Sequence, residues 1–263
     1  MAPDPSLYIG TCGFSYPEWI DAGIYPSGTK SAQMLSLYSR LFPVVELNYT
    51  WYQMVRADAM ERMLAGNESA LLFCAKLTRT MTHEIAETWQ DQASQYLHGI
   101  LPLLQSKRLL AVLVQLPPSF RRTQENRTYL ARLLDILQSL PLAVEFRHRS
   151  WFHDSVFSTL EQRRITLVSV DAPPLPDLFP ALDVVTNPDF FYLRLHGRNL
   201  QGWRSGSKQQ QFNYNYTDDE LSEWTQSRIP KMRSACNKGI ILFNNHVSGQ
   251  AVRNAQAMAD LLA

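Results

Sequence analysis

The feature that most constrains the fold of this chain is a series of eight short apolar segments spread along its whole length. Within them apolar and polar residues do not alternate cleanly, which is typical of strands that are buried on both faces. Such strands favour a parallel sheet whose connections are helices. The predicted strands are residues 7–12, 44–48, 71–76, 110–116, 142–146, 166–171, 191–196 and 240–245.

Amphipathic helices are predicted in most of the intervals between these strands. Residues 31–42 and 123–140 carry apolar side chains at helical spacing on one face. The sequence TDDE at 217–220 has the pattern of a capping box and predicts the start of a helix. The link 172–182 contains four prolines, which predicts little helix. Eight strand–helix repeats predict an α/β fold, a (β/α)8 TIM barrel that forms a single domain over residues 1–263.

A doubly wound open sheet is the alternative architecture. Its dinucleotide-binding form carries G-x-G-x-x-G after the first strand, and GTCGFS at 10–15 does not have that spacing. Because no other cofactor motif is visible, we predict no cofactor. Ser15 also lacks the G-x-S-x-G pattern of a hydrolase nucleophile.

Composition excludes several classes of protein. Hydrophobic residues make up 45% and charged residues 19%, as in soluble globular proteins, and a net charge of +1 gives no overall attraction to nucleic acid or membrane. The three cysteines are far apart and form no C-x-x-C pair, which argues against a disulfide framework or a thiolate zinc site. The N-terminus lacks the pattern of a signal peptide, and no apolar run approaches the ~18 residues of a membrane span. We therefore expect a cytoplasmic protein with no membrane partner.

Polar residues gather at the carboxyl ends of the predicted strands, where barrel enzymes place their chemistry. Side chains two residues apart share one face of a strand, so several of these residues are expected to point together into the barrel mouth. One explanation is a network of ion pairs that closes the barrel, and the other is a ligand site. The number of charged groups at one face favours a ligand site. The strand-end residues are Glu46, Asn48, Lys76, Gln115, Glu145, Arg147, Asp171, Arg194, His196, Asn244, Asn245 and His246.

Two loops extend this predicted site. Loop 197–216 is long, contains Arg198 and two further cations but no acid, and includes Trp203. Cations and flat rings together suit a phosphorylated, sugar-like or nucleotide-like ligand, although a mobile surface loop is the alternative. After the last strand, Ser248 and Gly249 precede a helix whose free N–H groups are suited to binding phosphate.

A divalent metal is the weaker alternative for the same residues. No H-x-H or H-E-x-x-H spacing is present, and the neighbouring arginines would repel a cation. Cys12 is either a nucleophile or a small core residue. His83 and His148 follow strands and are either general bases or hydrogen-bonding loop residues. The strand-end residues of metal-binding type are Glu46, Glu145, Asp171, His196 and His246.

Several motifs together resemble the domain of unknown function 72 family, also called YecE-like. The resemblance is collinear over nearly the whole chain. It implies a TIM barrel and a distant relation to sugar isomerases and to the barrel of endonuclease IV, which is an analogy of fold. No activity is attached to the family. The motifs are YIGTCGFSYPEW (8–19), VVELNYTWY (44–52), FCAKLTRTMTH (73–83), VLVQLPPSF (112–120), AVEFRHRSWF (143–152), FYLRLHGRN (191–199) and FNNHVSGQAVRNA (243–255).

The chain departs from the family pattern at a few positions outside the strand-end set. Cys12 stands where the family usually has a small residue such as serine, so the resemblance implies no required thiol. Arg149 stands where proline is usual, and QMVRA at 53–57 lacks a proline that usually follows WY. The recurring polar positions of the family all have a matching residue here, which implies that the family's site is present.

Three functional hypotheses follow. The first is an enzyme that binds a small anionic or polyhydroxylated ligand and performs isomerase or hydrolase chemistry by acid–base catalysis. The second is a protein that binds nucleic acid or cleaves phosphodiesters, and the third is a non-catalytic binding module. For the enzyme, the predicted catalytic residues are Glu145, His196, His246 and Asp171. The predicted ligand-binding residues are Glu46, Asn48, Lys76, Gln115, Arg147, His148, Arg194, Arg198, Trp203, Asn244, Asn245, Ser248 and Gly249.

Overall fold

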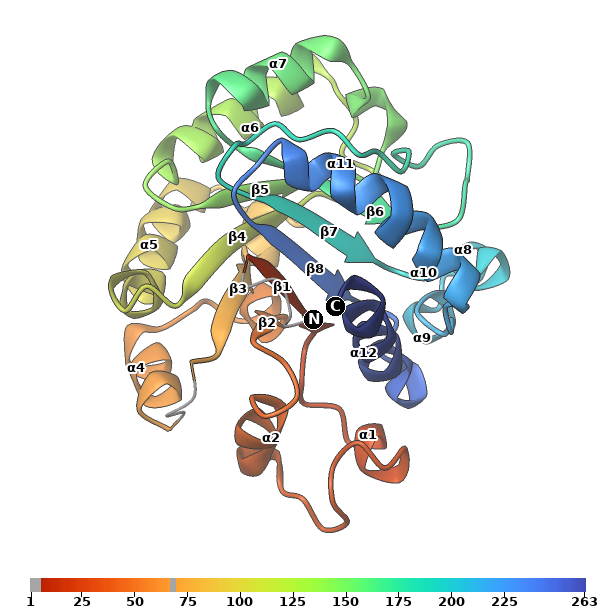
Figure 1. Cartoon of the computed structure of the whole chain (residues 1–263). Helices are drawn as coiled ribbons and strands as arrows, with labels where there is room; N and C mark the ends of the chain where they lie inside the picture. Colours follow the sequence, from red (N-terminus) through yellow and green to blue (C-terminus); the bar gives the residue numbers. More distant parts are fainter. Residues whose placement is uncertain (1–5, 67–69) are drawn as a thin grey trace.

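The computed structural model describes residues 6–66 and 70–263, and its eight strands close into a barrel in sequence order (Figure 1). Each strand pairs in parallel with its neighbours, and β1 pairs with β8 to complete the ring. This confirms the predicted TIM barrel, and the observed strand ends lie within two residues of those predicted. The strands are β1 (Leu7–Cys12), β2 (Val44–Leu47), β3 (Leu72–Lys76), β4 (Leu109–Gln115), β5 (Leu142–Glu145), β6 (Thr166–Asp171), β7 (Phe191–Leu195) and β8 (Gly239–Phe243).

Helices surround the ring of strands (Figure 1). The α-helices are α1 (Glu18–Asp21), α2 (Ser31–Tyr38), α3 (Tyr49–Tyr52), α4 (Ala57–Ala65), α5 (Trp89–Gln105), α6 (Gln124–Ile136), α7 (Asp154–Gln162), α8 (Leu200–Ser205), α9 (Lys208–Gln211), α10 (Asp218–Glu223), α11 (Ile229–Ser234) and α12 (Gln250–Leu262). Three short 3₁₀-helices are η1 (Arg79–Met81), η2 (Arg149–Trp151) and η4 (Val247–Gly249), and η3 (Trp224–Arg228) is a π-helix.

Local sequence signals explain several helix boundaries. The predicted capping box is present at the start of α10, where Thr217 accepts a hydrogen bond from the Glu220 amide and Glu220 accepts one from the Thr217 amide. The proline-rich link between β6 and β7 contains no helix, as predicted. In the described part of the chain, no helix combines the length and the apolar character that crossing a membrane requires.

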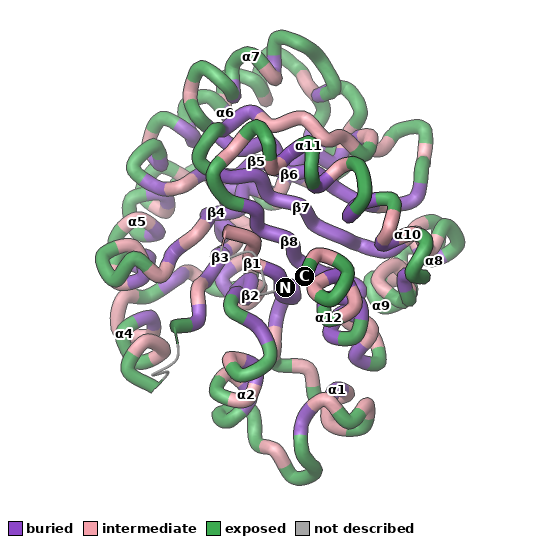
Figure 2. Tube along the Cα trace, viewed as in Figure 1, coloured by how far each residue is buried: buried purple, intermediate pink, exposed green. Residues whose placement is uncertain are grey.

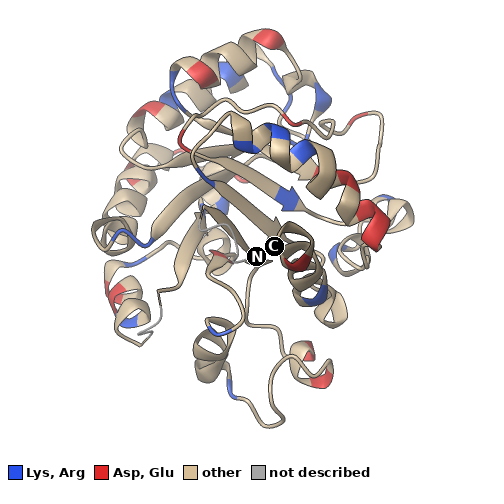
Figure 3. Ribbon diagram, in the orientation of Figure 1, with Lys and Arg blue, Asp and Glu red and all other residues tan. Residues whose placement is uncertain are grey.

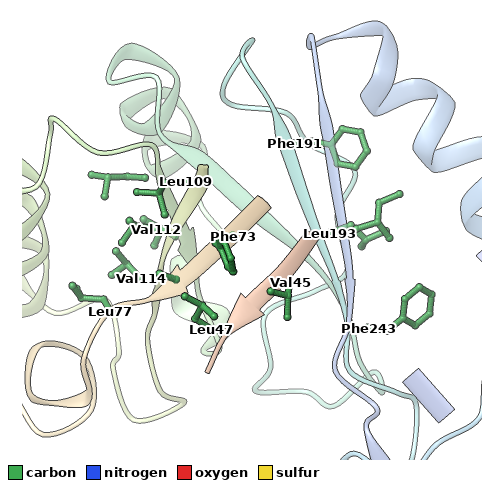
Figure 4. Packing of buried hydrophobic residues seen from close by; sticks show 14 of the residues in the cluster. Val45, Leu47, Phe73, Leu77, Leu109, Val112, Val114, Phe191, Leu193 and Phe243 are labelled. Atoms are coloured by element: carbon green, nitrogen blue, oxygen red, sulfur yellow. The ribbon is translucent and has the colours of Figure 1, made fainter. Parts of the chain in front are cut away.

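The apolar core has two layers, because successive side chains of a strand point to opposite faces. The larger layer lies between strands and helices, and Figure 4 shows part of it around Val45, Phe73 and Leu193. The smaller layer fills the barrel interior and includes Cys74 and Leu113. Figure 2 shows the strands as the most buried part of the chain, and Figure 3 shows charged residues mainly on helices and loops. Charged side chains on the strands therefore stand out as exceptions.

Candidate active site

The two-residue repeat of each strand decides which predicted site residues enter the barrel. The interior apolar layer ends with residues such as Leu113, Ala143 and Tyr192. A residue two positions further along the same strand lies on the same face and nearer to the carboxyl end. The predicted residues that follow interior residues at this spacing are Glu46, Lys76, Gln115, Glu145, Arg194 and Asn244.

Arg194 lies at the centre of this interior polar layer. Its Nη2 is 2.7 Å from Glu46 Oε1 and its Nε donates to Glu46 Oε2 at 3.0 Å. Its Nη1 donates to Glu145 Oε2 at 2.5 Å, and the Tyr192 hydroxyl donates to Glu46 Oε2 at 2.5 Å. The side chains of Arg194 and both glutamates are 0% exposed. Removing any one of them would leave an unpaired buried charge, so these three residues form a structural floor beneath the mouth.

Arg147 connects this floor to the opening. Its Nε lies 2.5 Å from Glu145 Oε1, its Nη2 contacts His196 Nε2 at 3.1 Å, and its guanidinium carbon lies 5.3 Å from the centre of the Trp203 ring. The Nε and Oε1 atoms are close but their geometry forms no hydrogen bond. Burial raises the pKa of Glu145, but Arg147 and Arg194 outweigh burial and hold that pKa well below its usual value. Glu145 therefore stays ionised, which makes it a poor proton donor.

His196 is neutral and fully buried. Burial, followed by the charge of Arg147, holds its pKa well below the usual value. An arginine can only donate, so Nε2 of His196 accepts from Arg147 and Nδ1 carries the ring hydrogen. The side-chain nitrogen of Asn244, Nδ2, lies 2.9 Å from Nδ1, and turning this amide over would place its oxygen there to accept that hydrogen. Both ring nitrogens are thus occupied, and His196 positions Arg147.

Lys76 and His83 are two further titratable side chains of the mouth. The Lys76 side chain is 14% exposed and its Nζ lies 3.9 Å from Glu46 Oε1. Burial, followed by the charge of Arg194, lowers the pKa of Lys76 to about 8. Nδ1 of His83 accepts from the Trp51 indole at 3.2 Å, so its Nε2 carries the hydrogen. Burial and the cations Lys76 and Arg147 lower the pKa of His83 to about 4.

The connection between β7 and α10, residues 197–216, is not an irregular loop, because it contains α8 and α9. Arg198 Nη2 lies 2.8 Å from Asp171 Oδ2 and donates to Glu223 at 2.8 Å. Asp171 also accepts from the Tyr216 hydroxyl at 2.8 Å and the Trp224 indole at 2.7 Å. Asp171 lies on the helix-facing side of β6, where it pairs with Arg198. The two residues fasten this connection to α10.

The same connection carries aromatic rings over the mouth. The Arg147 guanidinium faces the ring of Trp203. The Lys208 ammonium lies 5.0 Å from the centre of the Trp51 ring. The ring of Phe212 is 6.0 Å from that of His196. The indole N–H of Trp203 is buried without a hydrogen-bond partner among the described residues. An oxygen atom of a ligand could accept a hydrogen bond from this unsatisfied donor and lie close to the Arg147 cation.

Three of the remaining predicted residues also lie near the mouth. Gln115 Oε1 is 3.4 Å from Arg194 Nη1. The side-chain oxygen of Asn48 is buried and, among the described residues, without a hydrogen-bond partner. His246 stacks on Tyr16 with ring centres 4.4 Å apart, and its Nδ1 lies 3.4 Å from Glu18 Oε1. Burial lowers the pKa of His246.

Other predicted residues have local structural partners. His148 caps η2 by accepting from the amide of Ser150 at 3.0 Å. Asn245, on the helix-facing side of β8, donates to the Tyr214 carbonyl at 2.8 Å. Ser248 and Gly249 do precede the last helix, as predicted, and both adopt positive φ angles. The Ser248 carbonyl accepts from Arg253, at 2.7 Å.

Sequence reasoning did not include four aromatic residues in the site. Trp51 and Tyr16 lie in the family motifs at 44–52 and 8–19, but no charge or spacing distinguishes them from core aromatics. Tyr192 could have been found, because it precedes Arg194 by two residues on the same strand face. Phe212 lies in a segment without a periodic pattern, so its position depends on the tertiary structure.

Neither a metal centre nor a reactive thiol is supported by the residues of the mouth. Among residues 6–66 and 70–263, no three His, Cys, Asp or Glu side chains are grouped so that they could hold a metal ion. Cys12 is fully buried, and burial together with Glu46 raises the pKa of its thiol. The thiol therefore stays protonated, as expected for a core residue.

A cavity of about 590 Å³ opens at the opposite, amino-terminal end of the barrel, beside the starts of β4, β5 and β8. Four of its charged residues form surface pairs, Arg163 with Asp135 and Arg164 with Asp189, each at 2.7 Å, and the exposed Lys238 also lines it. Exposed pairs of this kind contribute little energy, and residues at this end of TIM barrels usually serve stability. The unsatisfied and perturbed groups lie at the carboxyl end, so we place the candidate active site there.

Comparison with known proteins gives a consistent relationship. Residues 8–263 match the family described as Protein of unknown function DUF72. UPF0759 protein YunF of Bacillus subtilis (strain 168) is 30% identical, and the alignment covers 97% of this chain and 94% of that protein. A DUF72 family protein (TM1631) of Thermotoga maritima MSB8 is similar in structure, with a TM-score of 0.85, 31% identity and coverage of 97% and 98% of the two chains. A DUF72 family protein of Enterococcus faecalis V583 also has a TM-score of 0.85, with 26% identity and coverage of 97% and 95%.

Proposed function

This chain belongs to the DUF72 family of proteins of unknown function, and we propose that it is an enzyme acting on a small anionic ligand at the carboxyl end of the barrel. The ligand class is a phosphorylated or carboxylated compound such as a sugar phosphate. The reaction class is proton transfer, as in an isomerase or a hydrolase. Three features of the mouth support the proposal: its charge, its aromatic walls and its titratable groups.

The charge balance of the mouth is the observation that carries the proposal. Two buried carboxylates, Glu46 and Glu145, face three cations, Lys76, Arg147 and Arg194. One positive charge is therefore left uncompensated in a place with little access to water. An anionic ligand would supply the missing charge, and electrostatic interactions of this kind are strongest where water is excluded.

The walls of the mouth suit a ligand with oxygen atoms. The Trp203 indole N–H and the Asn48 side-chain oxygen are a donor and an acceptor without partners among the described residues. Burying such groups costs free energy unless they are hydrogen-bonded. A polyhydroxylated ligand would satisfy both, while the ring of Trp203 would cover one of its faces.

The groups suited to moving a proton differ from those expected from sequence. Glu145 is clamped between two arginines and His196 has both nitrogens occupied. Lys76 has a pKa of about 8, and a pKa near the operating pH favours general acid–base catalysis. We infer that Lys76 is the main titrating group, that His83 assists it, and that Glu145 holds Arg147 in place.

The nucleic-acid alternative has weaker support. Two of the three cations of residues 197–216 contact other parts of the chain, because Arg198 pairs with Asp171 and Lys208 lies over Trp51. Arg204 is exposed. One free cation gives a small footprint for a phosphate backbone, whose binding would weaken steeply with salt.

A thermal-shift experiment tests the proposal. We expect ribose 5-phosphate and inorganic phosphate to raise the unfolding midpoint, and ribose to leave it unchanged, because ligand binding to the folded state stabilises it. Lys76→Gln and Arg147→Gln should each reduce the shift. The matched controls Lys238→Gln and Arg149→Gln remove exposed cations outside the mouth and should retain it.

Two results would contradict the proposal. One is a panel in which no phosphorylated probe shifts the midpoint of the wild-type protein. The other is a phosphate-dependent shift that persists in Lys76→Gln and Arg147→Gln but disappears in Lys238→Gln, which would move the anion site to the opposite end of the barrel. Binding without any turnover of a sugar phosphate panel would favour the non-catalytic binding module.

A further inference from the structure

Lys76 occupies an unusual position for a lysine. It ends β3 on the interior face of the strand, two residues after the fully buried Cys74. An ammonium has three hydrogens to donate. Within the described part of the chain its Nζ makes no hydrogen bond, and its nearest carboxylate oxygen, on Glu46, is 3.9 Å away.

The partners that normally hold a buried ammonium in its charged form are engaged elsewhere. Both oxygens of Glu46 accept hydrogen bonds from Arg194, and one also accepts from Tyr192. The charge of Arg194 and the loss of water both favour the neutral amine of Lys76. With a pKa of about 8, Lys76 is mainly protonated near pH 7, but a larger fraction of it is neutral than in an ordinary lysine. That neutral fraction has the free lone pair of a lysine nucleophile.

We propose that Lys76 forms an imine with the carbonyl carbon of an anionic aldehyde or ketone bound in the mouth. The inference rests on the proposed function, because the mouth must first bind the anionic group. The Nζ lone pair attacks the carbonyl carbon, and the electron pair of the C=O bond moves to oxygen. Both hydrogens of the neutral amine end on that oxygen, which leaves as water while the C=N bond forms. Amine and carbonyl thus give imine and water, and no further reactant is needed.

The surrounding residues fit the steps that follow imine formation. Once protonated, the imine withdraws electrons from the neighbouring carbon and makes its hydrogen easier to remove. His83 is neutral, senses the charge of Lys76 and has a hydrogen on its Nε2. Its Nε2–H is therefore suited to donate a hydrogen bond to the ligand, while Arg147 holds the anionic group of the ligand. This assigns the ligand class as α-carbonyl acids and phosphorylated ketones or aldehydes.

Reductive trapping tests the imine directly. The full-length protein is incubated at about pH 7 with pyruvate, glyoxylate or dihydroxyacetone phosphate in the presence of cyanoborohydride, and adducts are located by peptide mass mapping. At this pH an amine of pKa about 8 has a neutral fraction on the order of a hundredfold larger than an ordinary lysine. We expect labelling of Lys76 at least about tenfold faster than labelling of the exposed Lys238.

The controls separate failure of the imine from failure of the anion site. Lys76→Arg should lose the adduct, and Lys238→Arg should keep it. Labelling of Lys76 no faster than of Lys238 with all three probes would overturn the imine. If phosphate still raises the unfolding midpoint of the wild-type protein in that case, the proposed anion site stands without it. Absence of both the adduct and the phosphate shift would overturn both proposals.

Discussion

Arg194 carries its charge where neither it nor its partners Glu46 and Glu145 reach water. Replacing Arg194 by leucine would leave two carboxylates buried with reduced compensation. We expect Arg194→Leu to lower the free energy of unfolding by about 3–5 kcal/mol, measured by urea denaturation. Arg164→Leu, which removes an exposed partner of Asp189, should change it by less than about 1 kcal/mol. A small effect of Arg194→Leu would show that the floor of the mouth is not structural.

Asp171 offers a second test at the scale of the residue. Asp171→Ala removes the acceptor of the buried Tyr216 hydroxyl and of the buried Trp224 indole. Each unsatisfied group costs about 1–3 kcal/mol, so we expect a loss of at least about 2 kcal/mol in chemical denaturation. Asp189→Ala is the exposed control. Phosphate binding per folded molecule should stay unchanged in Asp171→Ala. If the variant no longer binds phosphate, Asp171 is part of the anion site.

The predicted site residues differ in how far sequence could place them. Charge and strand-end position identified Glu46, Glu145 and Arg194 correctly as neighbours. Asp171 and Asn245 were grouped with them, although an odd spacing from interior residues puts them on the helix-facing side of their strands. The face could have been worked out from the two-residue repeat. Which arginine pairs with which glutamate could not be worked out in this way, because the pairing depends on distances between strands that are remote in sequence.

At the scale of elements, the connection of residues 197–216 decides how closed the mouth is. It begins at Gly197, which has a φ of +92°, and an added Cβ would lie 2.5 Å from Tyr214 Cβ. Sequence predicted a long loop here, and the structure contains α8 and α9 instead. Short helices of four to six residues leave too little periodicity to be predicted, since one turn cannot show a repeat.

Gly197→Ala tests this closure. We expect it to destabilise the protein by about 2 kcal/mol or more, because strain from a positive φ adds to the clash with Tyr214. Gly28→Ala is the matched control, because Gly28 has a φ of +79° and open space around it. It should cost only about 1 kcal/mol. Equal effects in a thermal melt would show that the connection does not pack tightly at the end of β7.

At the scale of the whole molecule, the barrel itself was the most predictable feature. Eight apolar segments without alternation predicted eight parallel strands, and their order around the ring follows from sequence order. The strands were predictable because a strand buried on both faces consists mainly of apolar residues without polar alternation. The mouth is less predictable, because Trp51, Trp203 and Phe212 reach it from connections whose paths are set by tertiary contacts.

Burial of Lys76 within the barrel also predicts how the stability of the whole protein depends on pH. Its folded pKa of about 8 lies below the ordinary value of 10.5, so the unfolded chain binds more protons between these two values. The free energy of unfolding should therefore rise by about 3 kcal/mol from pH 8 to pH 10.5, relative to Lys76→Met. Urea titrations of both proteins at a series of pH values measure this difference. If the difference in free energy of unfolding between the two proteins does not change with pH, Lys76 is an ordinary surface amine.

The location of the anion site is the central claim, and one crystallographic measurement tests it most directly. Crystals grown without phosphate or sulfate are soaked in tungstate, a heavy tetrahedral oxyanion, and its anomalous signal is mapped. We predict a peak at the carboxyl end of the barrel, in contact with Lys76 and Arg147. A peak confined to the opposite cavity, beside Arg163, Arg164 and Lys238, would contradict the account.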